Sequence, residues 1–172
     1  MKTISFKTDV LPLKNEIYRL ALRITLNHAE AEDVVQETLI KVWNRRESWN
    51  QIESMEAFCL TICRNLALDK MRKMDNQSQS IDDEGYNTPD QSRSANPEEN
   101  TVHQDRIALL RKLMNSLPEK QRSMMLLRET EGKSYKEIAQ ILSVSEEQVK
   151  VNIFRARQTI KQKFIETENY GL

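Results

Sequence analysis

Hydrophobic residues recur at intervals of three and four positions through most of this chain, which is the spacing of one face of an α-helix. Only three glycines and four prolines interrupt the 172 residues, so long helices are unobstructed. The pattern predicts an all-α fold. In the N-terminal half we expect helices over about 11–26, 29–45 and 55–74, and in the C-terminal half over about 104–117, 118–132, 134–142 and 145–164.

One aromatic residue extends the apolar face of the second expected helix. Trp43 follows Leu39 and Val42 at helical spacing, so we expect it in the core. The first and third helices have apolar faces of their own. These faces consist of Ile17, Leu20, Ala21 and Ile24 in the first helix, and of Phe58, Ile62, Leu66 and Met71 in the third. The three helices are predicted to pack as one small N-terminal domain over residues 8–75.

The middle of the chain, residues 76–103, has a different composition. It carries six acidic residues and one basic residue, and Pro89 and Pro97 interrupt it. Such a segment buries too little apolar surface to offset the entropy of ordering it. We therefore expect a flexible acidic linker between the N-terminal domain and a second helical domain over 104–168. The net charge of zero hides this division, because residues 104–172 alone carry 13 basic and nine acidic side chains.

Two helix-start signals lie close together in the C-terminal domain. Ser134 is followed three positions later by Glu137, and Ser145 by Gln148, so each serine is predicted to cap a helix in a capping box. Two helices joined by so short a turn form a helix-turn-helix. The second of them is expected to pack inward through apolar residues at helical spacing, which are Val149, Ile153, Ala156, Ile160 and Phe164.

The outward face of that second helix is basic, and no acidic residue occurs from 148 to 163. A basic face suits the phosphates that flank the major groove, and the amides of Gln148 and Asn152 are of the type that pairs with adenine. An ordinary solvated helix face is the alternative. The caps, the turn length and the one-sided charge together favour DNA binding. The candidate DNA-binding residues are Gln148, Lys150, Asn152, Arg155, Arg157 and Lys161.

Several segments carry a resemblance that spans nearly the whole chain. Residues 29–43 read AEAEDVVQETLIKVW, and residues 62–72 read ICRNLALDKMR. Residues 117–122, 131–139 and 149–157 read LPEKQR, EGKSYKEIA and VKVNIFRAR. These segments resemble parts of the extracytoplasmic-function (ECF) sigma factors. The first resembles their polymerase-docking helix, the second their −10-element helix, and the last three together their −35-binding domain. The resemblance implies an alternative sigma factor whose partners are core RNA polymerase and promoter DNA, with an anti-sigma factor as a further possible partner.

The resemblance also implies a set of interface residues. The polymerase-docking face would consist of Asp33, Gln36, Glu37, Ile40 and Asn44. Four of these share one helix face, although the sequence alone would favour an ordinary solvated face. The −10 element would be bound by Trp49, Asn65, Asp69 and Arg72. An unpaired base stacked on an aromatic ring contributes about 1–3 kcal/mol. For Trp49, packing onto the core is an equally good interpretation.

Two positions depart from the family pattern. Ser143 stands in the turn of the helix-turn-helix, where glycine is common, and a left-handed serine there costs on the order of 1 kcal/mol. Asn152 stands where many relatives carry a basic residue. The −35 sequence preference of the family therefore does not carry over to this chain.

No residue pattern indicates an enzyme. The sequence contains no nucleophile motif, phosphate-binding glycine loop or metal signature, so we expect no catalytic residue, cofactor or metal. Cys59 and Cys63 lie four apart on one helix face, and buried thiols are favoured over a zinc site because His28 and His103 are distant. No apolar run approaches the roughly 20 residues that span a bilayer, so we expect a cytoplasmic protein without membrane insertion.

Two other functions stay open at this point. One is a stand-alone helix-turn-helix transcriptional regulator, whose N-terminal domain binds a ligand or dimerises. The other is a protein–protein adaptor with no role on DNA. The basic final helix argues against the adaptor, and the docking-like second helix argues against the lone regulator.

Overall fold

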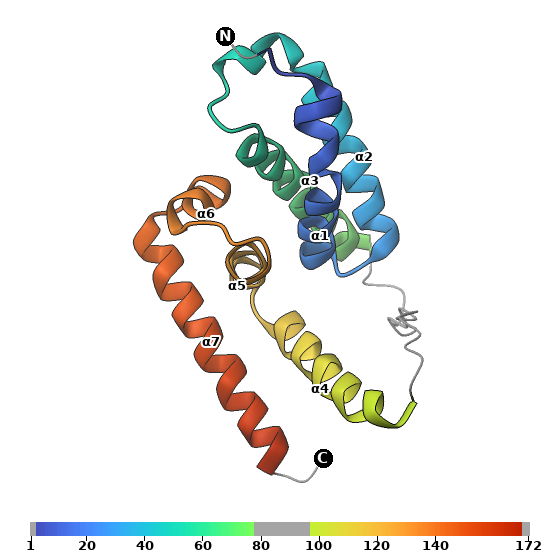
Figure 1. Cartoon of the computed structure of the whole chain (residues 1–172), viewed down its shortest axis with the longest axis vertical. Helices are drawn as coiled ribbons and strands as arrows, with labels where there is room; N and C mark the ends of the chain where they lie inside the picture. The colour runs from blue at the N-terminus through green and yellow to red at the C-terminus, as the bar shows by residue number, and fades with distance from the viewer. Residues whose placement is uncertain (1–2, 78–96, 170–172) are drawn as a thin grey trace.

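The computed structural model of the chain describes residues 3–77 and 97–169, and every regular element in those ranges is a helix (Figure 1). This confirms the predicted all-α fold. Short π-helical and 3-10 turns accompany the longer helices; they are η1 (Phe6–Val10), η2 (Leu11–Leu13), η3 (Arg46–Gln51) and η5 (Leu126–Thr130). The longer helices are α1 (Lys14–Thr25), α2 (His28–Asn44), α3 (Met55–Gln77), α4 (Pro97–Ser116), α5 (Glu119–Met125), α6 (Tyr135–Leu142) and α7 (Glu146–Asn169).

In the N-terminal half, α1, α2 and α3 each pack against the other two. The apolar face of α1 is fully buried there, as at Ile17 and Leu20. The helix ends at Leu26, whose left-handed backbone (φ 56°) lets the chain reverse. Asn27 then caps α2, because its side-chain oxygen accepts a hydrogen bond from the Glu30 amide at 3.0 Å.

The expected linker over 76–103 is helical at both of its ends. Helix α3 continues through Gln77, and α4 begins at Pro97 rather than near 104. A proline followed by two glutamates is a favourable helix start, because proline lacks the amide hydrogen that a helix leaves free there and acidic residues suit the amino end. Residues 78–96, the remainder of the expected linker, lie outside the described residues.

Both capping boxes predicted in the C-terminal half are present. The Ser134 hydroxyl accepts from the Glu137 amide at 3.1 Å, and the Glu137 carboxylate accepts from the Ser134 amide at 3.3 Å. Ser145 and Gln148 exchange the equivalent hydrogen bonds at 3.1 and 3.2 Å. Between the two helices, Ser143 adopts φ 56°, the left-handed conformation expected of the turn. Helices α6 and α7 therefore form the predicted helix-turn-helix.

Three large apolar residues that lie at helical spacing with buried neighbours are exposed. Trp43 is 46% exposed, so its predicted place in the core is wrong. Phe6 of η1 and Trp49 of η3 make edge-to-face contacts with Trp43, and the Arg46 guanidinium lies over the Trp43 ring, 4.7 Å from its centre. Ile107 and Leu110 are each 42% exposed because α4 has α7 as its main neighbour and buries only the end of its apolar stripe.

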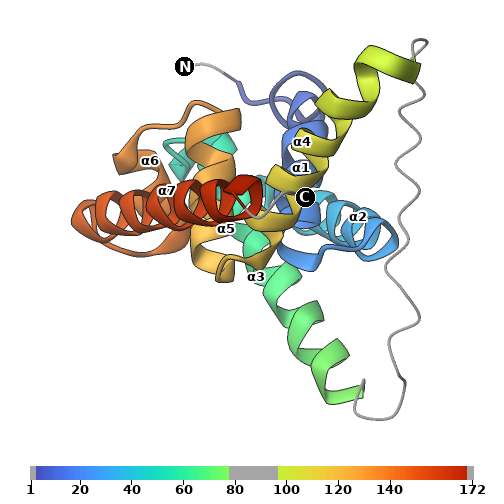
Figure 2. The same ribbon diagram turned by 90° about the horizontal axis from the view of Figure 1, so that it is seen from below.

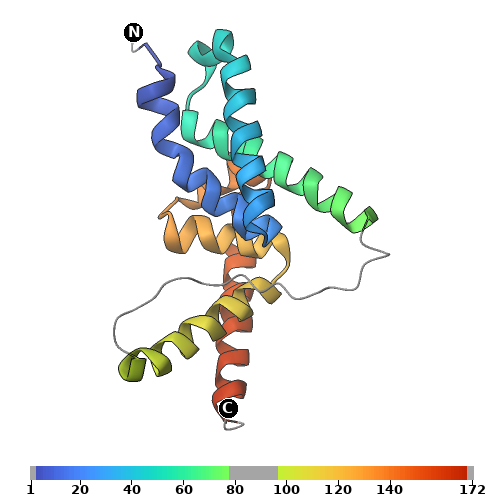
Figure 3. The same ribbon diagram turned by 90° about the vertical axis from the view of Figure 1, so that its right-hand side faces the viewer.

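The two halves are in contact, with α5 against α1 and α6 against α3 (Figures 2 and 3). Arg122 of α5 is buried at this contact. Its guanidinium donates hydrogen bonds to the backbone carbonyl oxygens of Arg23 and Ile24, at 3.1 and 3.3 Å. These carbonyls belong to the last turn of α1, where the negative end of the helix dipole favours a cation.

Ion pairs also join the two halves. Arg64 of α3 lies 3.0 Å from Glu119 of α5. Lys133, just before α6, lies 3.1 Å from Glu16 of α1 and also pairs with Glu56 of α3. The Lys133 and Glu16 side chains are only 14% and 12% exposed, so this pair is screened from solvent far more than a surface salt bridge.

Candidate nucleic-acid and protein interfaces

The first candidate interface is the outward face of α2. All five residues predicted to dock on polymerase are exposed there, and Ile40 is 59% exposed. A large apolar side chain that stays uncovered among polar and acidic neighbours is a common feature of protein–protein contact surfaces. The face consists of Asp33, Gln36, Glu37, Ile40 and Asn44.

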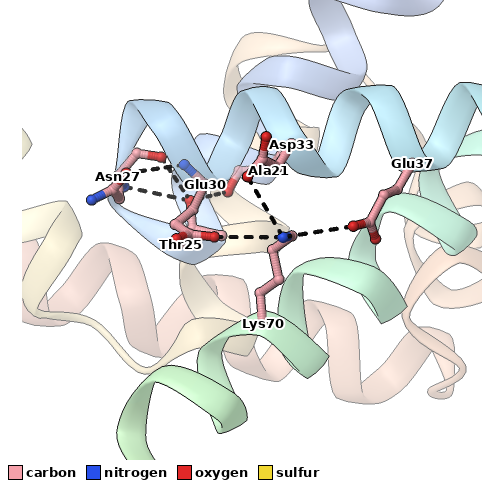
Figure 4. Close-up of polar contacts among 7 residues, drawn as sticks. All are labelled: Ala21, Thr25, Asn27, Glu30, Asp33, Glu37 and Lys70. Carbon is pink, nitrogen blue, oxygen red and sulfur yellow. Dashed lines mark hydrogen bonds and ion pairs between the residues drawn. The ribbon is translucent and has the colours of Figure 1, made fainter. Parts of the chain in front are cut away.

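Lys70 of α3 lies against the edge of this face and completes a cluster that sequence reasoning missed (Figure 4). Its ammonium nitrogen lies 3.6 Å from Glu30, 3.9 Å from Asp33 and 3.7 Å from Glu37. The three carboxylates follow one another at helical spacing along α2. A search for acidic residues at positions i, i+3 and i+7 would have found the stripe, but its cation comes from another helix.

Of the four residues proposed to bind the −10 element, three are exposed and one is buried. Asn65, Asp69 and Arg72 are exposed on α3, where Asp69 and Arg72 form an ion pair. Trp49 is only 6% exposed, and its indole nitrogen donates a hydrogen bond to the Val42 carbonyl oxygen at 3.0 Å. This placement matches packing of Trp49 onto the core and not the stacking of an unpaired base on its ring.

On the helix-turn-helix, the predicted inward and outward faces of α7 are separated as expected. Val149, Ile153 and Ala156 are at most 1% exposed. Five of the six candidate DNA-binding residues are exposed, and Asn152 is half-buried. The exposed five are Gln148, Lys150, Arg155, Arg157 and Lys161.

Both amide side chains proposed to read bases are engaged with the backbone near the start of α7. The Gln148 side-chain oxygen accepts the hydrogen bond from Ser145 that completes the second capping box. The Asn152 amide nitrogen donates to the Gln148 backbone carbonyl oxygen at 2.7 Å. A bidentate pair with adenine uses both the oxygen and the nitrogen of an amide, and the capping bond already occupies one of the two lone pairs of the Gln148 oxygen.

Two of the basic residues are held by contacts within the C-terminal half. Arg157 forms an ion pair with Glu129, and the hydrogen bond that it donates to this carboxylate raises the pKa of Arg157. The Lys150 ammonium lies 5.8 Å from the centre of the Tyr135 ring, and the Arg128 guanidinium lies 4.4 Å from the same ring. Tyr135 thus gathers two cations at the start of α6.

Helix α7 also presents two exposed apolar side chains that the sequence analysis did not single out as candidate contacts. Phe154 is 63% exposed and Val151 is 44% exposed. Both are displaced in helical phase from the buried residues of α7, so the spacing alone was sufficient to place them outward. Apolar side chains in a major groove can contact the methyl group of thymine.

Comparison with known proteins shows that the α2 face and the helix-turn-helix belong to two regions of one protein family. Residues 10–77, which contain α1 to α3, match Sigma-70 region 2, and residues 107–160 match Sigma-70, region 4. The ECF RNA polymerase sigma factor SigL of Mycobacterium tuberculosis is 32% identical over 148 residues, covering 84% of this chain and 80% of that protein. The chain belongs to the ECF sigma factors of the sigma-70 family. The exposed α2 face and Lys70 thus lie in region 2, and the helix-turn-helix lies in region 4.

Some relatives of this ECF sigma factor are longer. SigE of Mycolicibacterium smegmatis is 33% identical over 148 residues, and the match covers 56% of that protein. The probable sigma factor RfaY of Xanthomonas campestris is 29% identical over 160 residues, and the match covers 40% of it. The chain therefore spans about half the length of these two curated relatives.

The arrangement of the halves also has a counterpart among solved structures. The sigma factor RpoE from Bartonella quintana, crystallised with the anti-sigma factor NepR, superposes with a TM-score of 0.72 at 27% identity, covering 91% of this chain and 94% of that one. CnrH, in complex with the cytosolic domain of CnrY, shares the fold with a TM-score of 0.66. None of the helices in residues 3–77 and 97–169 combines the length and apolar character needed to cross a membrane.

Proposed function

We propose that this chain binds core RNA polymerase in the cytoplasm and directs it to promoters, so that transcription starts at sites the core enzyme does not select alone. The observation that supports this most is the combination, in one sigma-70 chain, of an exposed acidic and apolar face on α2 with a helix-turn-helix whose second helix is basic. The chain supplies recognition in this proposal, and the polymerase supplies the chemistry.

Each half has its own role in the proposal. Region 2 docks on polymerase through α2, with Ile40 at the centre of the contact. On α3, Asn65, Asp69 and Arg72 face the opened −10 element, since all three side chains are exposed. Helix α7 lies in the major groove of the −35 element. The RpoE–NepR complex supports an anti-sigma factor as a further partner, because that sigma factor resembles this chain over nearly its full length.

The stand-alone regulator stays as the second candidate because the helix-turn-helix is complete by itself. The two functions differ in what the free protein does. A regulator binds its operator tightly without polymerase. The proposed sigma factor needs core enzyme before it binds a promoter, because each half offers only a small DNA surface.

Run-off transcription with purified core polymerase and a genomic DNA library tests the proposal. We expect discrete transcripts that depend on the added protein. Ile40→Asp places a charge in the docking face. It should abolish these transcripts because it prevents binding to core enzyme, which co-elution measures. Leu11→Asp is the matched control, because Leu11 is an exposed apolar residue (41%) outside that face. Tight, sequence-specific duplex binding by the free protein, with no core association, would establish the regulator instead.

A further inference from the structure

Lys70 occupies the boundary between the docking face of α2 and the DNA-facing side of α3. Its ammonium lies 3.6 to 3.9 Å from three carboxylates, those of Glu30, Asp33 and Glu37. Each distance exceeds the roughly 3.2 Å limit of a nitrogen–oxygen hydrogen bond. The ammonium is therefore shared among the three carboxylates and is held tightly by none of them.

The charges of this cluster do not balance. One ammonium faces three carboxylates, so an excess of negative charge stays at the edge of α3. Asp33 and Glu37 are 61% and 50% exposed, whereas Lys70 is 21% exposed. A cationic docking partner can thus reach two of the carboxylates directly. In the free protein the same excess repels DNA phosphates that approach α3.

A lysine is well suited to exchange partners at such a boundary. Its charge sits on a flexible four-carbon stem and has three donors without a fixed geometry. When cations of a docked protein pair with Asp33 and Glu37, they both satisfy these carboxylates and repel the Lys70 ammonium. On α3, Lys70 lies about 100° round the helix from Asp69, so its long side chain must swing away from α2 and around the helix surface to bring the charge toward the side that carries Asp69.

We propose that Lys70 couples polymerase docking on α2 to promoter binding on α3, by transferring its charge from the carboxylates of α2 to a DNA phosphate once Asp33 and Glu37 are occupied. The inference rests on the proposed function and deepens it, since it assigns a physical cause to weak DNA binding by the free protein. It makes Lys70 a positioning residue in the free chain and a phosphate contact in the complex.

Docking can be imitated in the free full-length protein by removing the two exposed charges. The Asp33→Asn/Glu37→Gln variant keeps side-chain shape and leaves Lys70 with Glu30 alone. The probe is a fluorescein-labelled, single-stranded DNA oligonucleotide of random sequence, followed by anisotropy across a salt series. We expect about three- to tenfold tighter binding than wild type, with a salt slope steeper by about 0.7, the value for one additional phosphate contact on a single strand.

The decisive variant adds Lys70→Met to this background. We expect it to remove the gain and the added slope, whereas Lys70→Met alone should change binding little, because the wild-type carboxylates already hold the charge. The charge-matched control is Glu32→Gln/Glu47→Gln, two exposed carboxylates that make no ion pair with Lys70 in the described part of the chain. Lys70→Arg in the neutralised background should keep the gain, and it guards against a folding defect of the methionine variant.

Three results would overturn the coupling. The gain could persist with Lys70→Met, which would make it a general charge effect. It could appear equally in the Glu32→Gln/Glu47→Gln control. Lys70→Met could weaken binding equally in both backgrounds, which would place Lys70 on DNA at all times. The proposed function is tested separately by wild-type run-off transcription, so promoter-directed transcripts together with any of these results would leave the sigma factor intact and remove only the coupling.

Discussion

The indole nitrogen of Trp49 donates a hydrogen bond to the backbone carbonyl oxygen of Val42, 3.0 Å away, and this bond fastens η3 back onto the end of α2. Phe6 of η1 stacks on the indole of Trp49, with ring centroids 6.5 Å apart and an angle of 12° between the ring planes. Trp49 therefore closes one end of the N-terminal core, and Trp43, six positions earlier in the chain, stays on the surface.

Substitution should separate the roles of these two tryptophans. Trp49→Ala should lower the free energy of unfolding by about 3–5 kcal/mol, because it empties a core site, and Trp49→Phe by about 1 kcal/mol, because it mainly removes the hydrogen bond. Trp43→Ala should cost less than Trp49→Ala because nearly half of its surface is already in water. Urea unfolding followed by circular dichroism measures all three. Equal losses for the two alanine variants would contradict this assignment.

Arg122→Met should loosen the contact between the two halves. The substitution leaves the carbonyl oxygens of Arg23 and Ile24 without their charged donor, and a hydrogen bond to a charged group contributes about 1.5–3 kcal/mol. We expect a larger radius of gyration in solution scattering and a broader unfolding transition. Lys136→Met, at an exposed position on α6, is the control. A variant as compact and as cooperative as wild type would show that apolar contacts alone hold the halves together.

The two buried thiols predict a pH dependence of stability. Burial raises the pKa of Cys59 and of Cys63 from an ordinary 9.0 to about 12. Folding therefore favours the neutral thiols, and their contribution is complete below pH 9 and declines as the pH rises toward 12. Wild type should lose stability more steeply over this interval than Cys59→Ala/Cys63→Ala, in which other titrating groups are unchanged. Parallel curves for the two proteins would mean that the thiols ionise equally well in the folded state.

On α7, substitutions should distinguish base readout from phosphate contact. Asn152→Ala should change which −35 sequences are used, because amide-to-base pairing discriminates among bases by about 1–3 kcal/mol. Lys161→Ala should weaken all promoters alike and reduce the salt slope by about one unit. Transcription from a randomised −35 library with each variant measures both effects. An unchanged preference for Asn152→Ala together with Gln148→Ala would show that this face does not read DNA.

The elements that local chemistry determines could be predicted from the sequence. The serine caps at 134 and 145 mark both helices of the helix-turn-helix, and the left-handed Ser143 was expected because relatives often carry glycine at that position. The burial of Cys59 and Cys63 was predicted from their spacing of four positions on one helix face. Each of these features depends on residues within a few positions of one another.

The features that the sequence did not predict depend on distant partners. Helical phase places Trp43 beside Val42, but η1 and η3 decide which tryptophan is covered, and neither has a strong periodic pattern. The partners of Arg122 are backbone carbonyls, which any residue type supplies. Lys70 meets its three carboxylates only because α3 crosses α2 at that point. Gln148 was predicted both to cap a helix and to read a base, and its capping bond shows that both roles use the same side-chain oxygen.

The contact of Arg122 with Ile24 spans 98 positions of the chain, and this separation has a consequence for biosynthesis. The first three helices leave the ribosome before Arg122 does, so α1 must fold with its terminal carbonyls bonded to water. Closing a loop of about a hundred residues is slow relative to forming a local three-helix unit. The nascent chain is therefore expected to acquire its N-terminal half early and to gain protection at the end of α1 only in a late, separate step, which pulsed hydrogen exchange on stalled chains can time.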